Sequence, residues 1–199
     1  MRRILKRLAF AASLVVTSPL ILAAWLEKWI GRGEGVFVGM SQFLALIPGY
    51  VGTCLRGAYY YASLEKCSWE IHVGFGSIFT HRGASLGSNV SMGAYCVIGH
   101  ADIGGGTMLA SRISIPSGKR QHIDEFGRFT SAPRFDRVAI GSGSWIGEGA
   151  IIMANVGANS IVSAGAVIVN EMPAACLVGG NPAKVIKLLN RDADVPKVR

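Results

Sequence analysis

The sequence is poor in the residues that build metal centres, disulfide frameworks and acidic surfaces. It has four cysteines, none in a CxxC pair, and 12 acidic residues against 20 basic ones. Four cysteines could pair in a secreted domain, but scattered cysteines of this kind favour reduced, packed thiols of a cytosolic protein. The histidines, at positions 72, 81, 100 and 122, are separated by 9, 19 and 22 residues. The sequence therefore lacks the closely spaced pair of histidines that is typical of a metal site. We predict that the protein binds no metal.

Charged residues are also scarce, at 16% of the chain, whereas half of the residues are hydrophobic and the mean hydropathy is +0.39. Basic residues interleaved with aromatics, or a helix-turn-helix pattern, would indicate nucleic-acid binding, and the sequence has neither. The net charge of +8 predicts attraction to anionic lipid head groups or to phosphorylated ligands. The length suits one domain with a modest appendage.

What the sequence does have is a repeat. In the last third of the chain an isoleucine or valine recurs every six positions. The two series are Ile140, Ile146, Ile152 and then Val156, Val162, Ile168. A small residue follows several of these positions. Six residues is too long for one helical face and too regular for an ordinary strand. Hexapeptide repeats are typical of parallel β-helices, in which each short strand turns a corner and stacks on the coil below.

The same spacing is present upstream, with one slip of a residue: Val73, Phe79, Leu86, Met92, Ile98, and then Ile103, Leu109, Ile115. Between Ser117 and Arg137 the repeat is replaced by charged and aromatic residues. We predict that residues 117–137 form an excursion loop that leaves the solenoid. Long irregular loops on rigid scaffolds are disproportionately functional.

The N-terminus carries a basic cluster followed by an uncharged run from Leu8 to Leu26; the cluster is Arg2, Arg3, Lys6 and Arg7. One hypothesis is a signal peptide, although no clear cleavage site follows. The second is a spanning helix with its basic end in the cytoplasm. The third is a monotopic or re-entrant helix, kinked near Pro19, with Trp25 and Trp29 at the interface.

A second apolar run, from Val36 to Gly52, is broken by Pro48-Gly49 and is short for a full crossing. A single crossing would place the solenoid outside the cell, away from cytosolic acyl donors, whereas a hairpin would return it to the cytoplasm. We therefore favour a helical hairpin seated at the inner membrane with the solenoid facing the cytoplasm. The alternative is that this apolar surface packs on the solenoid or on another subunit.

These patterns predict a mainly β protein in three parts. Residues 1–69 form an apolar, membrane-associating helical region, residues 70–181 form the β-helix, and residues 182–199 form a short C-terminal helix and tail. In the third part Asn181 is a suitable helix cap and Pro182 a suitable first residue. We predict a helix running to about Asn190 that covers the open end of the solenoid.

Four motifs in the closing half carry a resemblance: Val138-Ala139-Ile140-Gly141, Ser144-Trp145-Ile146-Gly147, Ser163-Ala164-Gly165-Ala166-Val167 and Gly180-Asn181-Pro182-Ala183-Lys184. They resemble the hexapeptide-repeat acyltransferases, which include galactoside, maltose and serine acetyltransferases. The resemblance covers residues 70–188. It implies a left-handed parallel β-helix, a homotrimer, and acyl-CoA bound between neighbouring subunits. The segment from Ile115 to His122 is similar to a subgroup that acetylates sugars of cell-surface polysaccharides, and Ala45-Leu46-Ile47-Pro48-Gly49 is similar to its membrane-associated members.

His122 is the predicted catalytic residue. It matches the family's catalytic histidine in order along the chain, and a histidine can take the proton of an attacking hydroxyl and return it to a thiolate. The alternative is a solvated loop histidine. Family members orient this histidine with a carboxylate or a carbonyl; we name Glu125 for this role, with Asp124 and Asp102 as further candidates.

The resemblance also implies residues that contact acetyl-CoA: Trp145, Ala164, Gly165, Asn181, Lys184 and Lys187. Lys184 and Lys187 would meet the nucleotide phosphates, although both could instead lie on a solvated face. Asn170 departs from the family, where many members have a lysine, and this removes one phosphate contact. For the acceptor we name Asn89, His100 and Asp102; the alternative for His100, which the corner position favours, is a structural histidine with a local hydrogen bond.

Together these observations predict an acetyl-CoA-dependent O-acetyltransferase that modifies a sugar hydroxyl. The apolar N-terminal runs favour a membrane-borne or lipid-linked saccharide of surface polysaccharide biosynthesis, since a soluble acceptor gives no reason to hold the enzyme at a bilayer. The alternatives are an acetyltransferase for a small soluble acceptor, such as a free sugar, serine or an antibiotic, and a non-catalytic membrane scaffold.

Overall fold

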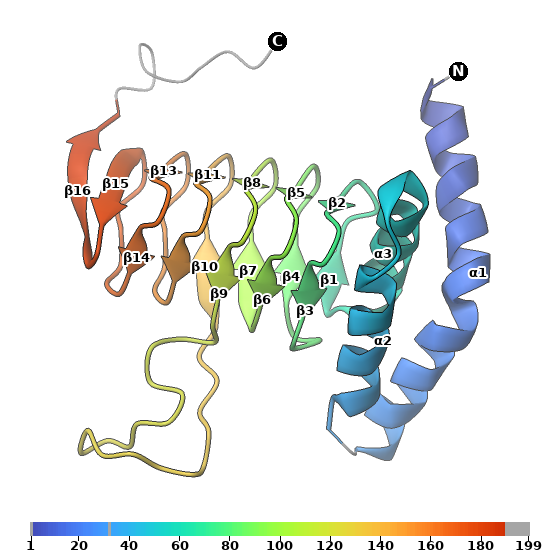
Figure 1. The fold of residues 1–199 in the computed structure, drawn as a ribbon, viewed down its shortest axis with the longest axis horizontal. Coiled ribbons are helices and arrows are strands. Elements are labelled where there is room, and N and C mark those ends of the chain that lie inside the picture. The colour runs from blue at the N-terminus through green and yellow to red at the C-terminus, as the bar shows by residue number, and fades with distance from the viewer. Residues whose placement is uncertain (1, 32, 190–199) are drawn as a thin grey trace.

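The computed structural model describes residues 2–31 and 33–189. Three helices at one end pack against a parallel β-solenoid, and a hairpin closes the other end (Figure 1). The helices are α1 (Arg2–Ile30), α2 (Gly35–Ala45) and α3 (Gly49–Ser63). The break between α2 and α3 falls at Pro48, as predicted, and α1 continues through Pro19.

Three parallel sheets form the sides of the solenoid. Sheet A consists of β1 (Lys66–Cys67), β4 (Ser85–Leu86), β7 (Ala101–Ile103) and β10 (Val138–Ile140). Sheet B consists of β2 (His72–Val73), β5 (Ser91–Met92), β8 (Met108–Leu109), β11 (Trp145–Ile146), β13 (Ile161–Val162), β15 (Cys176–Gly180) and β16 (Ala183–Leu188). Sheet C consists of β3 (Ile78–Phe79), β6 (Val97–Ile98), β9 (Ser114–Ile115), β12 (Ile151–Ile152) and β14 (Val167–Ile168).

The predicted repeat is the core of the solenoid. Every repeat residue named above, from Val73 to Ile168, is buried, with at most 4% of its surface exposed. Most strands are two residues long, so one side chain points inward and the next points out. A small residue after the buried one is needed because the next coil lies directly against it. A Cβ at Gly141, for example, would lie 2.2 Å from the nitrogen of Ala158.

The excursion is confirmed between β9, which ends at Ile115, and β10, which begins at Val138 (Figure 1). The solenoid begins slightly earlier than predicted, because β1 at Lys66–Cys67 already pairs with β4 in parallel register. Every later coil stacks on this first one.

The predicted C-terminal helix is wrong. Ala183–Leu188 is strand β16, which pairs antiparallel with β15. Gly180 has a φ of +98° and begins the tight reversal, and β-branched Val185 and Ile186 favour an extended chain. As a strand, this segment pairs with the edge of β15, which a helix would leave without backbone partners. Residues 190–199 of the predicted helix and tail lie outside the described residues.

Arg56 on α3 joins the helices to the solenoid. Its side chain is fully buried. It donates hydrogen bonds to the carbonyls of Leu44 and Ile47 at the end of α2, at 3.0 and 2.8 Å, and to that of Val73 in β2, at 3.0 Å. A buried guanidinium is tolerated here because carbonyl oxygens of the α2 end and of β2 accept hydrogen bonds from it. The α2 end, α3 and the first coil are thereby held together.

Candidate active site

The excursion loop is stabilised by backbone hydrogen bonds between its two arms. Arg134 N donates to Gln121 O at 2.9 Å, and Thr130 N donates to His122 O at 2.9 Å. Ile123 and Phe129 form an isolated antiparallel bridge. The loop is therefore a flattened hairpin-like arm with a defined tip.

Arg137 fixes the foot of this arm on the solenoid. Its guanidinium donates to Asp102 Oδ1 at 3.0 Å, to Glu65 Oε2 at 2.6 Å and to the Gly83 carbonyl at 3.0 Å, and it also lies against His100 Nε2. The hydrogen bond from Arg137 and its charge lower the pKa of the Glu65 carboxyl. The sequence analysis did not identify Arg137 as an anchor. Its position, one residue before β10, was the one indication that it lies where the loop rejoins the solenoid. His100 and Asp102, both predicted to bind substrate, are thus joined by it.

His122 is exposed on the arm and has its ring stacked on Phe129, with the ring centroids 6.1 Å apart. Within the described chain, its imidazole has no side-chain hydrogen bond, and neither a hydrogen bond nor an ion pair joins it to Glu125. Asp124 is occupied elsewhere: its carboxylate accepts from the backbone N–H groups of Phe126 and Arg128. Asp102 is held by Arg137 and by Ser85. The group that orients His122 therefore stays a prediction.

An open cavity of about 380 Å³ lies at the base of the loop, between it and the later coils. Lys119 crosses this space and donates to Val169 O at 2.8 Å and to Asn170 Oδ1 at 3.4 Å. Arg120 and Arg134 also line the cavity. A loop lysine thus lies beside position 170, where the resembled family often has a lysine of its own.

Trp145 lies in a row of outward-pointing residues that follows sheet B. The strand registers align, in order, His72, Ser91, Met108, Trp145, Ile161, Leu177 and Lys187. Met108 and Trp145 are 43% and 44% exposed. Of the predicted donor contacts, Trp145 and Lys187 therefore share one surface.

The other predicted donor contacts lie nearby on the same side of the solenoid. Ala164 and Gly165 form the exposed corner after β13, where Gly165 has a φ of +69°. Asn181 is exposed at the tip of the β15–β16 hairpin, and Lys184 is exposed on β16. Asn89 is separate from His100 and Asp102, because it occupies the corner before β5 with a φ of +57°. Residues 2–31 and 33–189 contain no group of three or more potential metal ligands.

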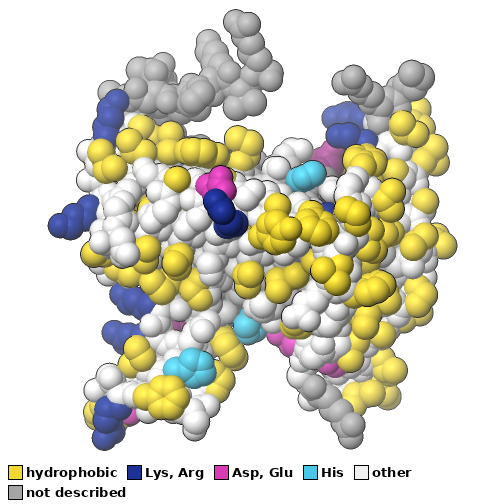
Figure 2. Space-filling view, in the orientation of Figure 1, with side chains coloured by type: hydrophobic (Ala, Val, Ile, Leu, Met, Phe, Trp, Pro, Cys, Tyr) yellow, Lys and Arg dark blue, Asp and Glu magenta, His cyan; other side chains and the backbone are white. Residues whose placement is uncertain are grey.

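In α1, several of the side chains that face the protein are polar, and many of those that face outward are apolar. Its protein-facing side buries Ser13, Thr17 and Glu27, while outward-facing Val15 and Trp29 are 73% and 85% exposed. Figure 2 shows hydrophobic side chains gathered over this helical end of the molecule. By length and composition alone, residues 3–30 form one helix that could cross a membrane.

Comparisons with known proteins agree with this fold, although no family model matches the chain. A 2,3,4,5-tetrahydropyridine-2,6-dicarboxylate N-acetyltransferase of Staphylococcus aureus is 36% identical over 95 residues, which cover 48% of this chain and 34% of that protein. The chain thus spans about a third of the length of the curated relatives it matches.

Two solved structures share the architecture. A maltose O-acetyltransferase from Clostridium difficile 630 has a TM-score of 0.67 and 23% identity, covering 77% of this chain and 85% of its own. A galactoside acetyltransferase in complex with coenzyme A has a TM-score of 0.68 and 17% identity, covering 78% and 80%. In its solenoid fold and in the sequence of its repeats, the chain is similar to hexapeptide-repeat acetyltransferases.

Proposed function

We propose that this chain is an acetyl-CoA-dependent O-acetyltransferase that modifies a sugar hydroxyl of a membrane-borne or lipid-linked saccharide. The observation that carries the proposal is the anchored arm, which presents the exposed imidazole of His122 away from a rigid solenoid. The names of the relative and of the two solved structures support acetyl transfer, and those of the latter support a sugar acceptor.

In the proposed reaction His122 takes the proton of the sugar hydroxyl as its oxygen attacks the thioester carbonyl. The tetrahedral intermediate then collapses, the carbon–sulfur bond breaks, and the imidazolium returns the proton to the departing thiolate. An imidazole without a competing hydrogen bond is suited to this role, and Glu125 is proposed to orient it once substrates are bound.

Lys119 is proposed to supply the phosphate contact that Asn170 does not. Its ammonium already lies at the edge of a cavity that Arg120 and Arg134 also line. A lysine beside arginines favours a diphosphate through charge-assisted hydrogen bonds. Trp145, Ala164, Gly165, Asn181, Lys184 and Lys187 keep their proposed contacts with the rest of acetyl-CoA.

The proposed assembly is a homotrimer with a site between neighbouring chains. Exposed apolar side chains on two faces of the solenoid support this assembly. They are Met108 and Trp145 on sheet B, and Val97 and Ile151 on sheet C. Each of these four side chains is at least 37% exposed in the single chain. Flat apolar faces of this kind are removed from water when copies associate. The arm would then reach the neighbouring chain.

We further propose that α1 lies along the surface of the inner membrane and that the solenoid faces the cytoplasm. Both ends of α1 contact the first coils: Arg7 lies 5.9 Å from the ring centroid of Trp69, and Glu27 pairs with Arg82. These positions are about 30 Å apart along a helix. A spanning helix would need that length to cross the hydrocarbon, whereas a helix lying flat can expose its apolar side to lipid. Arg3 and Arg7 would add about 1 kcal/mol each on anionic lipid.

The proposal is tested by acetyl transfer from acetyl-CoA to candidate saccharides by purified wild type and His122→Ala. Loss of a general base is expected to lower kcat/KM by roughly 10²–10⁴ while acetyl-CoA still binds. Ser131→Ala, an exposed change on the same arm, is the matched control and should behave as wild type. Equal transfer by wild type and His122→Ala would remove this histidine from the reaction.

A further inference from the structure

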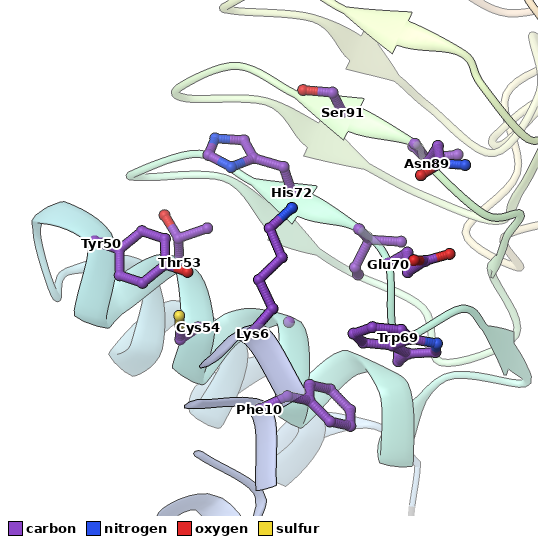
Figure 3. Close-up of a pocket in the computed structure, with 13 residues that line it drawn as sticks. Lys6, Phe10, Tyr50, Thr53, Cys54, Trp69, Glu70, His72, Asn89 and Ser91 are labelled. Atoms are coloured by element: carbon purple, nitrogen blue, oxygen red, sulfur yellow. The ribbon is translucent and has the colours of Figure 1, made fainter. Parts of the chain in front are cut away.

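A second pocket, of about 320 Å³, lies between the helices and the first coils of the solenoid. Lys6 and Phe10 of α1 and Tyr50 and Thr53 of α3 line it on one side, and Trp69, Asn89 and Ser91 are among the solenoid residues on the other. Figure 3 shows Lys6 extending across the middle of the pocket, with its amine toward His72.

The lining combines one lysine, one acidic residue (Glu70), aromatic rings and neutral polar groups. The rings of Phe10 and Trp69 are 5.9 Å apart and form an aromatic wall. In the described parts of the chain no carboxylate lies within ion-pair distance of Lys6, and Figure 3 shows the Glu70 carboxylate pointing away from it. Burial and the charge of Arg56 lower the pKa of His72, so His72 is neutral at pH 7. Lys6 thus has no ion-pair partner among the described residues, and the neutral polar groups of the pocket suit hydroxyls.

The pocket joins two surfaces that the proposed function uses. Tyr50 and its neighbour Val51 are 68% and 65% exposed and continue the apolar surface of the helices. On the other side, His72 and Ser91 begin the row on sheet B that leads through Met108 to Trp145. Trp145 is three strands beyond His72, or about 14 Å at the usual strand spacing.

We propose that this pocket binds the phosphate-bearing first sugar of the acceptor, an inference that rests on the proposed function. Lys6 contacts the phosphate, Trp69 stacks on the sugar ring, and Asn89 and Ser91 bond its hydroxyls. The lipid leaves the pocket over Tyr50 and the apolar surface, and the rest of the saccharide extends along sheet B toward Trp145. A soluble sugar phosphate has the same recognisable chemistry, and the experiment separates the two sources.

The test measures binding by calorimetry with the full chain in detergent micelles and without acetyl-CoA, so it is independent of catalysis. The first probe is glucose 1-phosphate, with free glucose beside it. Lys6→Gln should weaken glucose 1-phosphate binding by about tenfold or more and leave glucose unchanged. Arg3→Gln is the matched control, because Arg3 is an exposed cation of the same helix that does not line the pocket.

Asn89→Gly should weaken both ligands, since glycine accepts the positive φ of Asn89 and only the amide is lost. Unchanged glucose 1-phosphate binding in Lys6→Gln, or equal weakening in Arg3→Gln, would overturn the proposal. A prenyl diphosphate-linked glucose is the last probe. If the lipid-linked glucose binds more tightly than glucose 1-phosphate, the result supports a lipid-linked acceptor. If the two bind equally, the lipid-linked acceptor is excluded and a soluble sugar phosphate is the ligand.

Discussion

The ion pair between Glu27 of α1 and Arg82 of the solenoid offers a sharp test of how the helical region is held. The two side chains are 7% and 10% exposed, and Arg82 Nη2 lies 2.7 Å from Glu27 Oε2. Arg82 also donates to the Ala24 carbonyl at 2.8 Å. Glu27 accepts from the backbone N–H groups of Val36 and Phe37 at 2.7 and 3.1 Å, and so caps the start of α2.

Arg82→Met should release α1 from the solenoid. Removing one partner of a buried pair leaves the other charge uncompensated and costs about 3–5 kcal/mol. That cost corresponds to a loss of protection of roughly 100- to 4,000-fold in the amides of α1 and α2. Because the pair lies where the helices meet the first coils, the strands beyond β4 should keep their protection.

Hydrogen–deuterium exchange in detergent measures this effect segment by segment. The double variant Arg82→Met/Glu27→Gln should regain part of the lost protection, since no buried charge is then left alone; Glu34, the other carboxylate beside Arg82, is 31% exposed. Arg112→Met is the control, because Arg112 and Glu148 form a pair with side chains 70% and 50% exposed, worth below about 1 kcal/mol. Normal protection of α1 in Arg82→Met, or a double variant no better than the single one, would refute the reasoning.

Three further outcomes are expected. Lys119→Ala should raise KM for acetyl-CoA about tenfold with little change in kcat, whereas Ser131→Ala should not; steady-state kinetics that show no change would contradict the phosphate role. Burial raises the pKa of Glu27, but its two backbone hydrogen bonds and Arg82 outweigh this, so its pKa lies below the ordinary 4.5. Its stabilisation is therefore complete above pH 4.5 and is lost as acid titrates through the lowered value; tryptophan emission should report the release of α1 in wild type and not in Glu27→Gln. Trp145→Lys should dissociate the proposed trimer in detergent, and an unchanged mass by light scattering would exclude sheet B as the interface.

The repeat made the solenoid predictable, because one buried residue in six needs only local sequence to be recognised. Ile140, Ile146 and Ile152 lie inside as expected, and loss of the pattern at Ser117 located the loop. The C-terminal segment was mispredicted because Asn181-Pro182 is compatible with both a helix start and a tight turn. The free edge of β15, a tertiary feature, decides between them.

The site was less predictable than the fold, because its residues come from distant parts of the chain. Arg137 contacts Glu65, which lies 72 positions earlier, and Lys6 and Asn89 line one pocket although they belong to a helix and to the solenoid. Contacts between residues so far apart cannot be predicted from their spacing along the chain. Glu27, the single acidic residue of α1, was the one local indication that a buried partner docks this helix.

The most direct test of the central claim compares transfer to a lipid-linked saccharide with transfer to its water-soluble analogue. Val15→Lys/Leu22→Lys places two charges on the outward face of α1, where both side chains are more than 60% exposed, and leaves the solenoid intact. If α1 holds the enzyme at the bilayer, this variant should acetylate the soluble analogue as wild type does and lose most transfer to the lipid-linked acceptor in vesicles. Equal transfer to both acceptors by wild type and variant would contradict a membrane-borne substrate.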